Sequence, residues 1–268
     1  MIKIILIIVA VFIVYCLIEM IRELRDFRVT KYRICSQKLN GIKREKKIIF
    51  LSDLHNRMYG EENERLLESI RNQHPDLILI GGDMLVRKDG NSYDKTVHFL
   101  AKLPGICPVY CANGNHEQKL KELPDKYEQS YEEYKKALTA SGIHMLENAS
   151  ETVKLEEVPV KLSGLEIPLG AYARFGKKEL SLKEITDRIG EHGDDYQILL
   201  AHHPGYMKEY LAYRWSHFDE FYTVSKVFRG NLPGRRTDSS CKPRTWDAFG
   251  AVKTVELAGA DCSGIIRK

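Results

Sequence analysis

The sequence predicts an α/β fold, and three observations support this. From residue 46 onward, short apolar runs alternate with longer stretches of helical periodicity, and residues of metal-ligand type follow four of the runs. Fully apolar runs of about four to eight residues are typical of strands that are buried on both faces of a sheet. A chain of 268 residues, of which 43% are hydrophobic and 29% charged, can bury a substantial core, which excludes disorder as its main state.

The first 21 residues are expected to form a transmembrane anchor. Ile4 to Ile18 is an unbroken apolar run, and its apolar neighbours extend it towards the roughly 20 residues that a bilayer core needs. A cleaved signal peptide and a buried core helix are the alternatives, but no small-x-small cleavage site follows the run. The basic residues that follow it are Arg22, Arg25, Arg28, Lys31 and Arg33. By the positive-inside rule they predict a single-pass protein of the cell membrane whose main domain is cytoplasmic.

Residues 22–45 are interpreted as a basic juxtamembrane linker, either a solvated spacer or a segment that contacts anionic lipid headgroups. The whole chain has a net charge of +4. This is far below the charge of a dedicated nucleic-acid binder, so we expect no specific nucleic-acid partner. Six scattered cysteines, without the spacing of a zinc site, predict buried thiols in a reducing compartment. The oligomeric state is not predicted.

Residues 46–212 are expected to form the main domain. The predicted buried strands are 48–51, 76–80, 109–112 and 196–201, and the predicted helices are 63–73, 93–103, 125–141 and 182–189. The segments 152–155 and 158–162 alternate with a period of two, which predicts a hairpin in a second sheet.

Polar residues of metal-ligand type stand within a few positions after each of the four predicted buried strands. They are Asp53 and His55, then Asp83, then Asn115 and His116, and finally His202. Because the carboxyl ends of strands in α/β sheets are where ligands bind, these residues are expected to meet. Two glycines precede Asp83 and leave its carboxylate room to bridge two ions. Oxygen and nitrogen ligands together suit divalent ions of borderline hardness.

Each residue also has a structural interpretation when taken alone. Asp53 can cap the segment that follows it, and Asn115 can occupy a turn position. The adjacent His203 is an alternative ligand to His202, although the Leu-x-His-x-Pro pattern favours His202.

The motifs Asp-x-His at 53–55, Gly-Gly-Asp at 81–83 and Gly-Asn-His-Glu at 114–117, with a later histidine, resemble the calcineurin-like metallophosphoesterase family. The resemblance covers residues 46–210 and is closest to a membrane-anchored bacterial branch of that family. It implies a four-layer α/β/β/α sandwich, a phosphoester substrate and two divalent metal ions of the Mn, Fe or Zn class.

The resemblance also implies a role for each residue. Asp53 and His55 would hold the first ion, and Asp83 would bridge both ions. Asn115 and His202 would hold the second ion. A hydroxide activated by the two ions would attack phosphorus.

Two neighbouring residues would assist these ligands. His116 would donate to the phosphoester oxygens or to the leaving group. Glu117 would support the ligands without binding metal.

The chain departs from the family pattern after His202, where the pattern continues with a strand and Gly-His-x-His. No such motif is present, and beyond His203 the sequence has only His217. We therefore expect an incomplete C-terminal edge of the fold, weakened metal binding and impaired activity. Residues 213–268 are interpreted as a divergent tail that is either frame-shifted in the source gene or poorly ordered, while genuine divergence into a new interaction segment stays open.

The function predicted from these features is metal-dependent phosphoester hydrolysis near the membrane surface. One alternative is a lipid-linked pyrophosphate hydrolase, which an anchor would hold near headgroups. The other is a non-catalytic, membrane-tethered binding protein, which the absent histidine pair suggests. Activity at saturating manganese distinguishes the catalytic interpretations from the last one.

Overall fold

The computed structural model describes residues 2–86, 92–127, 130–172, 179–214, 221–223 and 252–259. Its strands are β1 (Val29–Ser36), β2 (Lys46–Leu51), β3 (Leu77–Ile80), β4 (Val109–Cys111), β5 (Ile143–Met145), β6 (Ala149–Leu155), β7 (Val158–Leu165), β8 (Tyr196–Ala201), β9 (Phe221–Thr223) and β10 (Val252–Gly259). Its helices are α1 (Ile2–Arg25), α2 (Glu64–Arg71), α3 (Asp94–Ala101), α4 (Asn115–Glu122), α5 (Tyr131–Ala140), α6 (Leu182–Ile189) and α7 (Met207–Arg214).

The strands form two mixed sheets. The six-stranded sheet has the order β1-β10-β2-β3-β4-β5, and the four-stranded sheet has the order β6-β7-β8-β9. Strands β2, β3, β4 and β5 are parallel, as are β7, β8 and β9, whereas β10 runs antiparallel to β2. The predicted α/β class is confirmed, and so is the predicted hairpin, which is the antiparallel pair β6 and β7.

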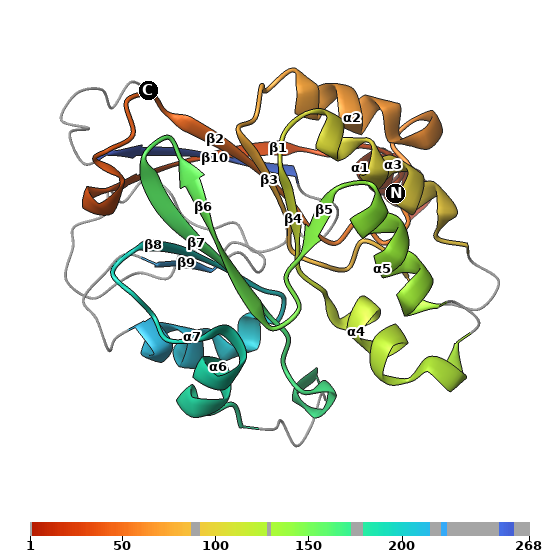
Figure 1. The fold of residues 1–268 in the computed structure, drawn as a ribbon. Helices are drawn as coiled ribbons and strands as arrows, with labels where there is room; N and C mark the ends of the chain where they lie inside the picture. Colours follow the sequence, from red (N-terminus) through yellow and green to blue (C-terminus); the bar gives the residue numbers. More distant parts are fainter. Residues whose placement is uncertain are drawn as a thin grey trace.

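Three buried hydrophobic clusters separate the layers of the fold. In the first, Ile49 and Ile78 of the six-stranded sheet pack against Leu66, Phe99 and Tyr134 of helices α2, α3 and α5. Alternate residues of the same strands face the second sheet and pack there in the second cluster. The third cluster covers the outer face of the second sheet with α6 and α7. Helices therefore lie on both outer faces of the paired sheets (Figure 1).

The strands predicted to be buried on both faces are buried in the structure. All four residues of β3 and all six residues of β8 are buried, so neither strand has a polar face. The second cluster explains this pattern, because Phe50 and Leu79 meet Val160 and Ile198 across the interface between the sheets.

Helix boundaries follow local capping residues. The helix predicted at 125–141 begins only at Tyr131, because the side chain of Ser130 accepts a hydrogen bond from the backbone N–H of Glu133 and caps it. Helix α6 begins after Ser181, which forms a reciprocal capping box with Glu184.

The predicted transmembrane helix is not supported. A helix, α1, does occupy the N-terminal segment, but in the part of the chain that the structure describes no helix is long and apolar enough to cross a membrane. The unbroken apolar run from Ile4 to Ile18 is shorter than the roughly 20 residues that a hydrocarbon core requires.

The first and last strands of the described chain pair with each other in the six-stranded sheet. Strand β1 lies inside the segment 22–45, which we interpreted as a linker, and β10 lies inside the predicted tail. Residues Val29–Ser36 pair in parallel with Val252–Gly259, which in turn pair with β2. The sequence analysis assigns no strand to residues 252–259, so this is a difference from the prediction. His217 lies outside the described residues.

Candidate metal centre

The residues predicted as metal ligands follow the carboxyl ends of four strands. Asp53 and His55 follow β2, Asp83 follows β3, Asn115 is the first residue of α4 after β4, and His202 follows β8. Because β2, β3 and β4 are parallel neighbours, their carboxyl ends lie at one edge of the sheet. The second sheet contributes β8 to the same place, since the His202 ring contacts Asp83.

The loops after β2 and β3 are bound to each other through their backbones. The N–H of Asp53 donates to the carbonyl of Gly82 at 3.1 Å, and that of His55 donates to the carbonyl of Asp83 at 3.0 Å. Asp53, His55 and Asp83 have φ angles of 56°, 51° and 53°, in the left-handed region that non-glycine residues seldom adopt. Such strained residues cluster at functional sites, where the surrounding structure holds them.

Gly82 is required where the loops after β3 and β4 touch. Its φ is +89°, and a Cβ at this position would lie 2.1 Å from the backbone nitrogen of Gly114. A side chain at residue 82 would therefore separate Asp83 from the Asn115 and His116 loop.

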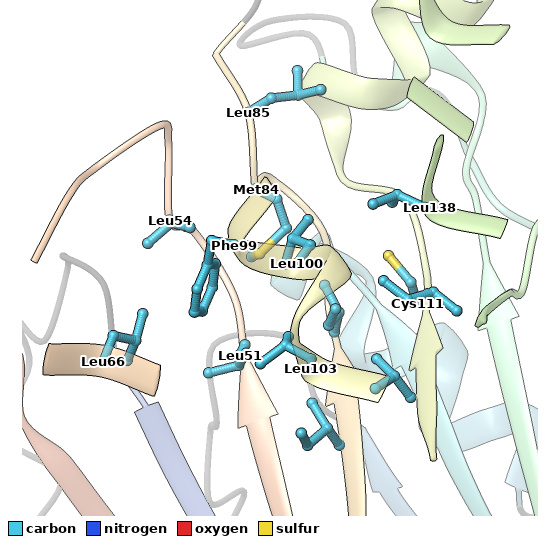
Figure 2. Packing of buried hydrophobic residues seen from close by; sticks show 14 of the residues in the cluster. Leu51, Leu54, Leu66, Met84, Leu85, Phe99, Leu100, Leu103, Cys111 and Leu138 are labelled. Carbon is cyan, nitrogen blue, oxygen red and sulfur yellow. The ribbon is translucent and has the colours of Figure 1, made fainter. Parts of the chain in front are cut away.

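Apolar residues beside the candidate ligands anchor these loops in the first cluster. Leu54 lies between Asp53 and His55, and Met84 follows Asp83. Figure 2 shows both side chains near Phe99 in that cluster. Packing of the intervening residues thus holds the polar side chains at the edge of the sheet.

Two groups of side chains can each hold a metal ion. One consists of Asp53, Asp83 and His202, and the other of His55, Asp83 and His116. In each group the candidate ligand atoms lie within 4.8 Å of one another. The Nε2 atoms of His202 and His55 lie 3.0 and 3.9 Å from Asp83 Oδ2. Asp83 therefore belongs to both groups, which is the arrangement that a bridging carboxylate needs.

The grouping differs in part from the predicted pairing. Asp53 is grouped with His202, although Asp53 Oδ1 also lies 3.6 Å from His55 Nε2. His116 is grouped as a candidate ligand, and its ring centroid lies 5.1 Å from that of His55. With its amide oriented to satisfy both partners, Asn115 donates to Asp83 Oδ2 at 3.3 Å and accepts from the backbone N–H of His116 at 3.2 Å.

These residues fit divalent ions. Bonds between a metal and its ligands are about 2.0 to 2.5 Å long, so two ligands of one ion lie at most about 5 Å apart, and both groups meet this limit. Carboxylate oxygens and imidazole nitrogens together suit ions of the Mn, Fe or Zn class.

Electrostatic coupling at the site centres on Asp83. Burial lowers the pKa of His202, but the hydrogen bond and charge of Asp83 outweigh it and raise the pKa to about 9. Burial raises the pKa of Asp83, yet the hydrogen bond and charge of His202 leave it lowered. A hydrogen bond with Asp53 is the main cause that raises the pKa of His55. Asp53 and Asp83 thus favour positive charge beside them, whether on a protonated histidine or on a bound metal cation.

Of the two adjacent histidines, His202 contacts the site. Its Nδ1 lies 2.9 Å from the carbonyl oxygen of Gly81, so a proton on Nδ1 leaves Nε2 directed at Asp83. The ring of His203 instead contacts the rings of Tyr172 and Tyr206.

Glu117 is buried behind the candidate ligands and binds the backbone of both loops. Its Oε2 accepts from the N–H groups of Asp83 and Gly114 at 2.9 and 3.0 Å, and its Oε1 accepts from Met84 and Leu85 at 2.8 and 3.3 Å. Burial raises the pKa of this carboxyl. Glu117 therefore fixes the backbone on which Asp83 stands.

The sequence analysis did not identify a further buried carboxylate, Glu166, which follows β7 and contacts Asn113. Its only local signal is an acidic residue a few positions after a predicted strand, and its partner Asn113 is 53 residues away.

Comparisons with known proteins agree with the motifs. A family model described as calcineurin-like phosphoesterase matches residues 46–230. The uncharacterized metallophosphoesterase YkoQ of Bacillus subtilis (strain 168) is 27% identical over 214 residues, which are 78% of this chain and 70% of that protein. Among solved structures, phosphopantetheinyl hydrolase (PptH) from Mycobacterium tuberculosis is 17% identical over 68% of each chain, with a TM-score of 0.36.

Proposed function

Since the chain belongs to the calcineurin-like phosphoesterase family and is a phosphoester hydrolase, we propose that its reaction uses two divalent metal ions that share Asp83. The observation that carries this proposal is the membership of Asp83 in both groups of candidate ligand atoms. Asp83 is also only 3% exposed, so its charge is poorly solvated and favours nearby cations.

We assign the other ligand positions to Asp53, His55, Asn115 and His202. The distances of Asp53, His55 and His202 to Asp83 support their assignment. Asn115 is assigned because it stands in the Gly-Asn-His-Glu motif and lies beside Asp83. When bound, divalent ions lower the pKa of a water molecule and neutralise charge on phosphoester oxygens.

We assign His116 to the substrate rather than to a metal ion, although its ring also belongs to one of the two groups of candidate ligand atoms. Its side chain is partly exposed, whereas Asp83 and His202 are buried, so it is accessible to a bound phosphoester. Its backbone N–H donates to Asp83 Oδ1 at 2.9 Å, which fixes the residue beside the ions. A histidine at this position can donate a proton to the departing oxygen.

The test is metal dependence with a count of bound ions. The purified full chain, stripped with a chelator, should lose hydrolysis of bis(p-nitrophenyl) phosphate and regain it with Mn²⁺, and metal analysis should approach two ions per chain at saturation. His202→Gln should lose bound metal, whereas His144→Gln should not, because His144 is exposed and contacts Glu151. Chelator-resistant activity would overturn metal dependence, and saturation at one ion would overturn the shared site.

A location at the membrane surface is a separate proposal. It rests on the exposed basic residues Arg28 and Lys31, which can attract anionic lipid headgroups on the cytoplasmic side. Sedimentation with anionic vesicles but not with neutral ones is the expected result, and equal sedimentation with both would contradict it.

A further inference from the structure

A buried polar cluster connects the loop before α4 to the second sheet. Its members are Asn113, Lys121, Tyr131, Asn148 and Glu166, which we call the Glu166 cluster. Asn113 and Glu166 are 2% and 4% exposed. Asn113 follows β4 of the first sheet, and Glu166 follows β7 of the second.

The Glu166 carboxylate has partners at both oxygens. Its Oε1 accepts from Asn113 Nδ2 at 2.7 Å. Its Oε2 accepts from Lys121 Nζ at 3.0 Å and from Asn148 Nδ2 at 3.2 Å. A buried carboxylate without such partners is strongly destabilising, so this geometry is an organised feature of the fold.

The cluster acts on the segment that carries Asn115 and His116. Asn113 stands two residues before Asn115, and its Nδ2 also donates to the hydroxyl of Tyr131 at 2.6 Å. Five residues after Asn113, Gln118 Nε2 donates to the carbonyl of Ile167 at 2.6 Å. The segment 113–118 is therefore bound on both sides of His116 to the residues that follow β7.

We propose that Glu166 is a positioning residue: through Asn113 it fixes the distance of Asn115 and His116 from Asp83. This inference rests on the proposed function, because it assigns Glu166 to the same site. Displacing a reacting group by about 1 Å lowers turnover by roughly a hundredfold, whereas a residue that only stabilises the fold leaves the turnover of folded molecules unchanged.

The decisive comparison is between two matched substitutions, Glu166→Gln and Glu147→Gln. Both carboxylates pair with Lys121, and Glu147 Oε2 lies 2.6 Å from its Nζ. Among the described residues, only Glu166 of this pair is hydrogen-bonded to Asn113. Glu166→Gln removes the negative charge that Lys121 Nζ contacts at both oxygens, at 3.3 and 3.0 Å, and so weakens the charge-assisted hydrogen bond that Asn113 donates to Oε1.

Steady-state kinetics and hydrogen exchange distinguish a positioning role of Glu166 from a merely structural one. For Glu166→Gln, kcat should fall about tenfold or more with KM within about twofold, whereas Glu147→Gln should keep the parent kcat. Hydrogen exchange in peptides that cover residues 113–118 should accelerate about tenfold or more in Glu166→Gln only. Asn113→Ala should reproduce both effects from the loop side, and the double variant should add little to either.

Equal kcat and equal exchange in the two Gln variants would overturn the inference. If Glu166→Gln does not fold, Asn113→Ala decides alone, and a parent-like kcat and exchange in that variant would likewise overturn it. If the parent shows no metal-dependent hydrolysis, the proposed function fails, and the exchange comparison still tests whether Glu166 holds the loop.

Discussion

Gly114→Ala should disable the site, because Gly114 packs directly against Asp83. A Cβ at residue 114 would lie 2.3 Å from Asp83 Oδ1 and 2.4 Å from the Asp83 backbone nitrogen. Rotating the Asp83 side chain cannot relieve both contacts, since one of them is with backbone. The loops after β3 and β4 must move apart instead.

The size of the effect follows from this geometry. Cβ atoms essentially never approach closer than 3.0 Å to such atoms, so the contact at 2.4 Å with the Asp83 backbone nitrogen requires a shift of about 0.6 Å or more in a close-packed interior. Overpacking of this kind lowers the free energy of unfolding by about 1 to 3 kcal/mol. A displacement of this order between Asp83 and the His116 loop should lower kcat about tenfold to a hundredfold.

Gly105→Ala is the matched control, because no atom lies within 4 Å of a Cβ built at that residue. Urea denaturation and initial rates of bis(p-nitrophenyl) phosphate hydrolysis with Mn²⁺ should be measured for both variants. The control should stay within about 0.5 kcal/mol of the parent. If Gly114→Ala matched Gly105→Ala in both stability and rate, the contact between Gly114 and Asp83 would not constrain the site.

The other predictions use the same assays. Asp83→Asn should lower hydrolysis more than Asn115→Ala, because it removes the shared charge; similar rates in the two variants would argue against a bridge. His116→Ala should slow turnover while metal analysis shows unchanged occupancy. In the metal-free protein, burial lowers the pKa of His202, but Asp83 outweighs this and raises it to about 9. A metal ion must displace the proton that His202 carries below this pH. Mn²⁺ affinity measured by calorimetry should therefore rise with pH up to about 9 and then level off. Glu117→Gln replaces one of two oxygens that each accept two backbone N–H groups, and thermal unfolding should show a loss of about 2 to 4 kcal/mol.

The strands and the strand-end residues were predictable because their signals are local. A run such as Leu77–Ile80 is apolar at every position because both faces of β3 are covered. A polar residue directly after such a run must stand at the carboxyl end of the strand. Asp53, Asp83 and His202 could therefore be located before any three-dimensional information was available.

Features that depend on distant pairing were not predictable. Val252–Gly259 becomes a strand between β1 and β2, but its alternation of small, charged and apolar residues has no clear period. Asn113 and Glu166 are ordinary loop residues in the sequence, and only the packing of one sheet against the other brings them to 2.7 Å. The transmembrane helix expected at residues 1–21 is not supported, because none of the helices that the structure describes is long and apolar enough to cross a membrane.

The position of β10 between β1 and β2 also sets an order of assembly during synthesis. Residues 29–36 pair with residues 252–259, so the first strand to leave the ribosome waits for one of the last. At about 5 to 20 residues per second the delay is roughly 10 to 45 s. Throughout that interval the edge of β2 that later receives β10 is open to pairing with another nascent chain. The yield of folded hydrolase should therefore depend on how well chaperones shield that edge until translation of residue 259.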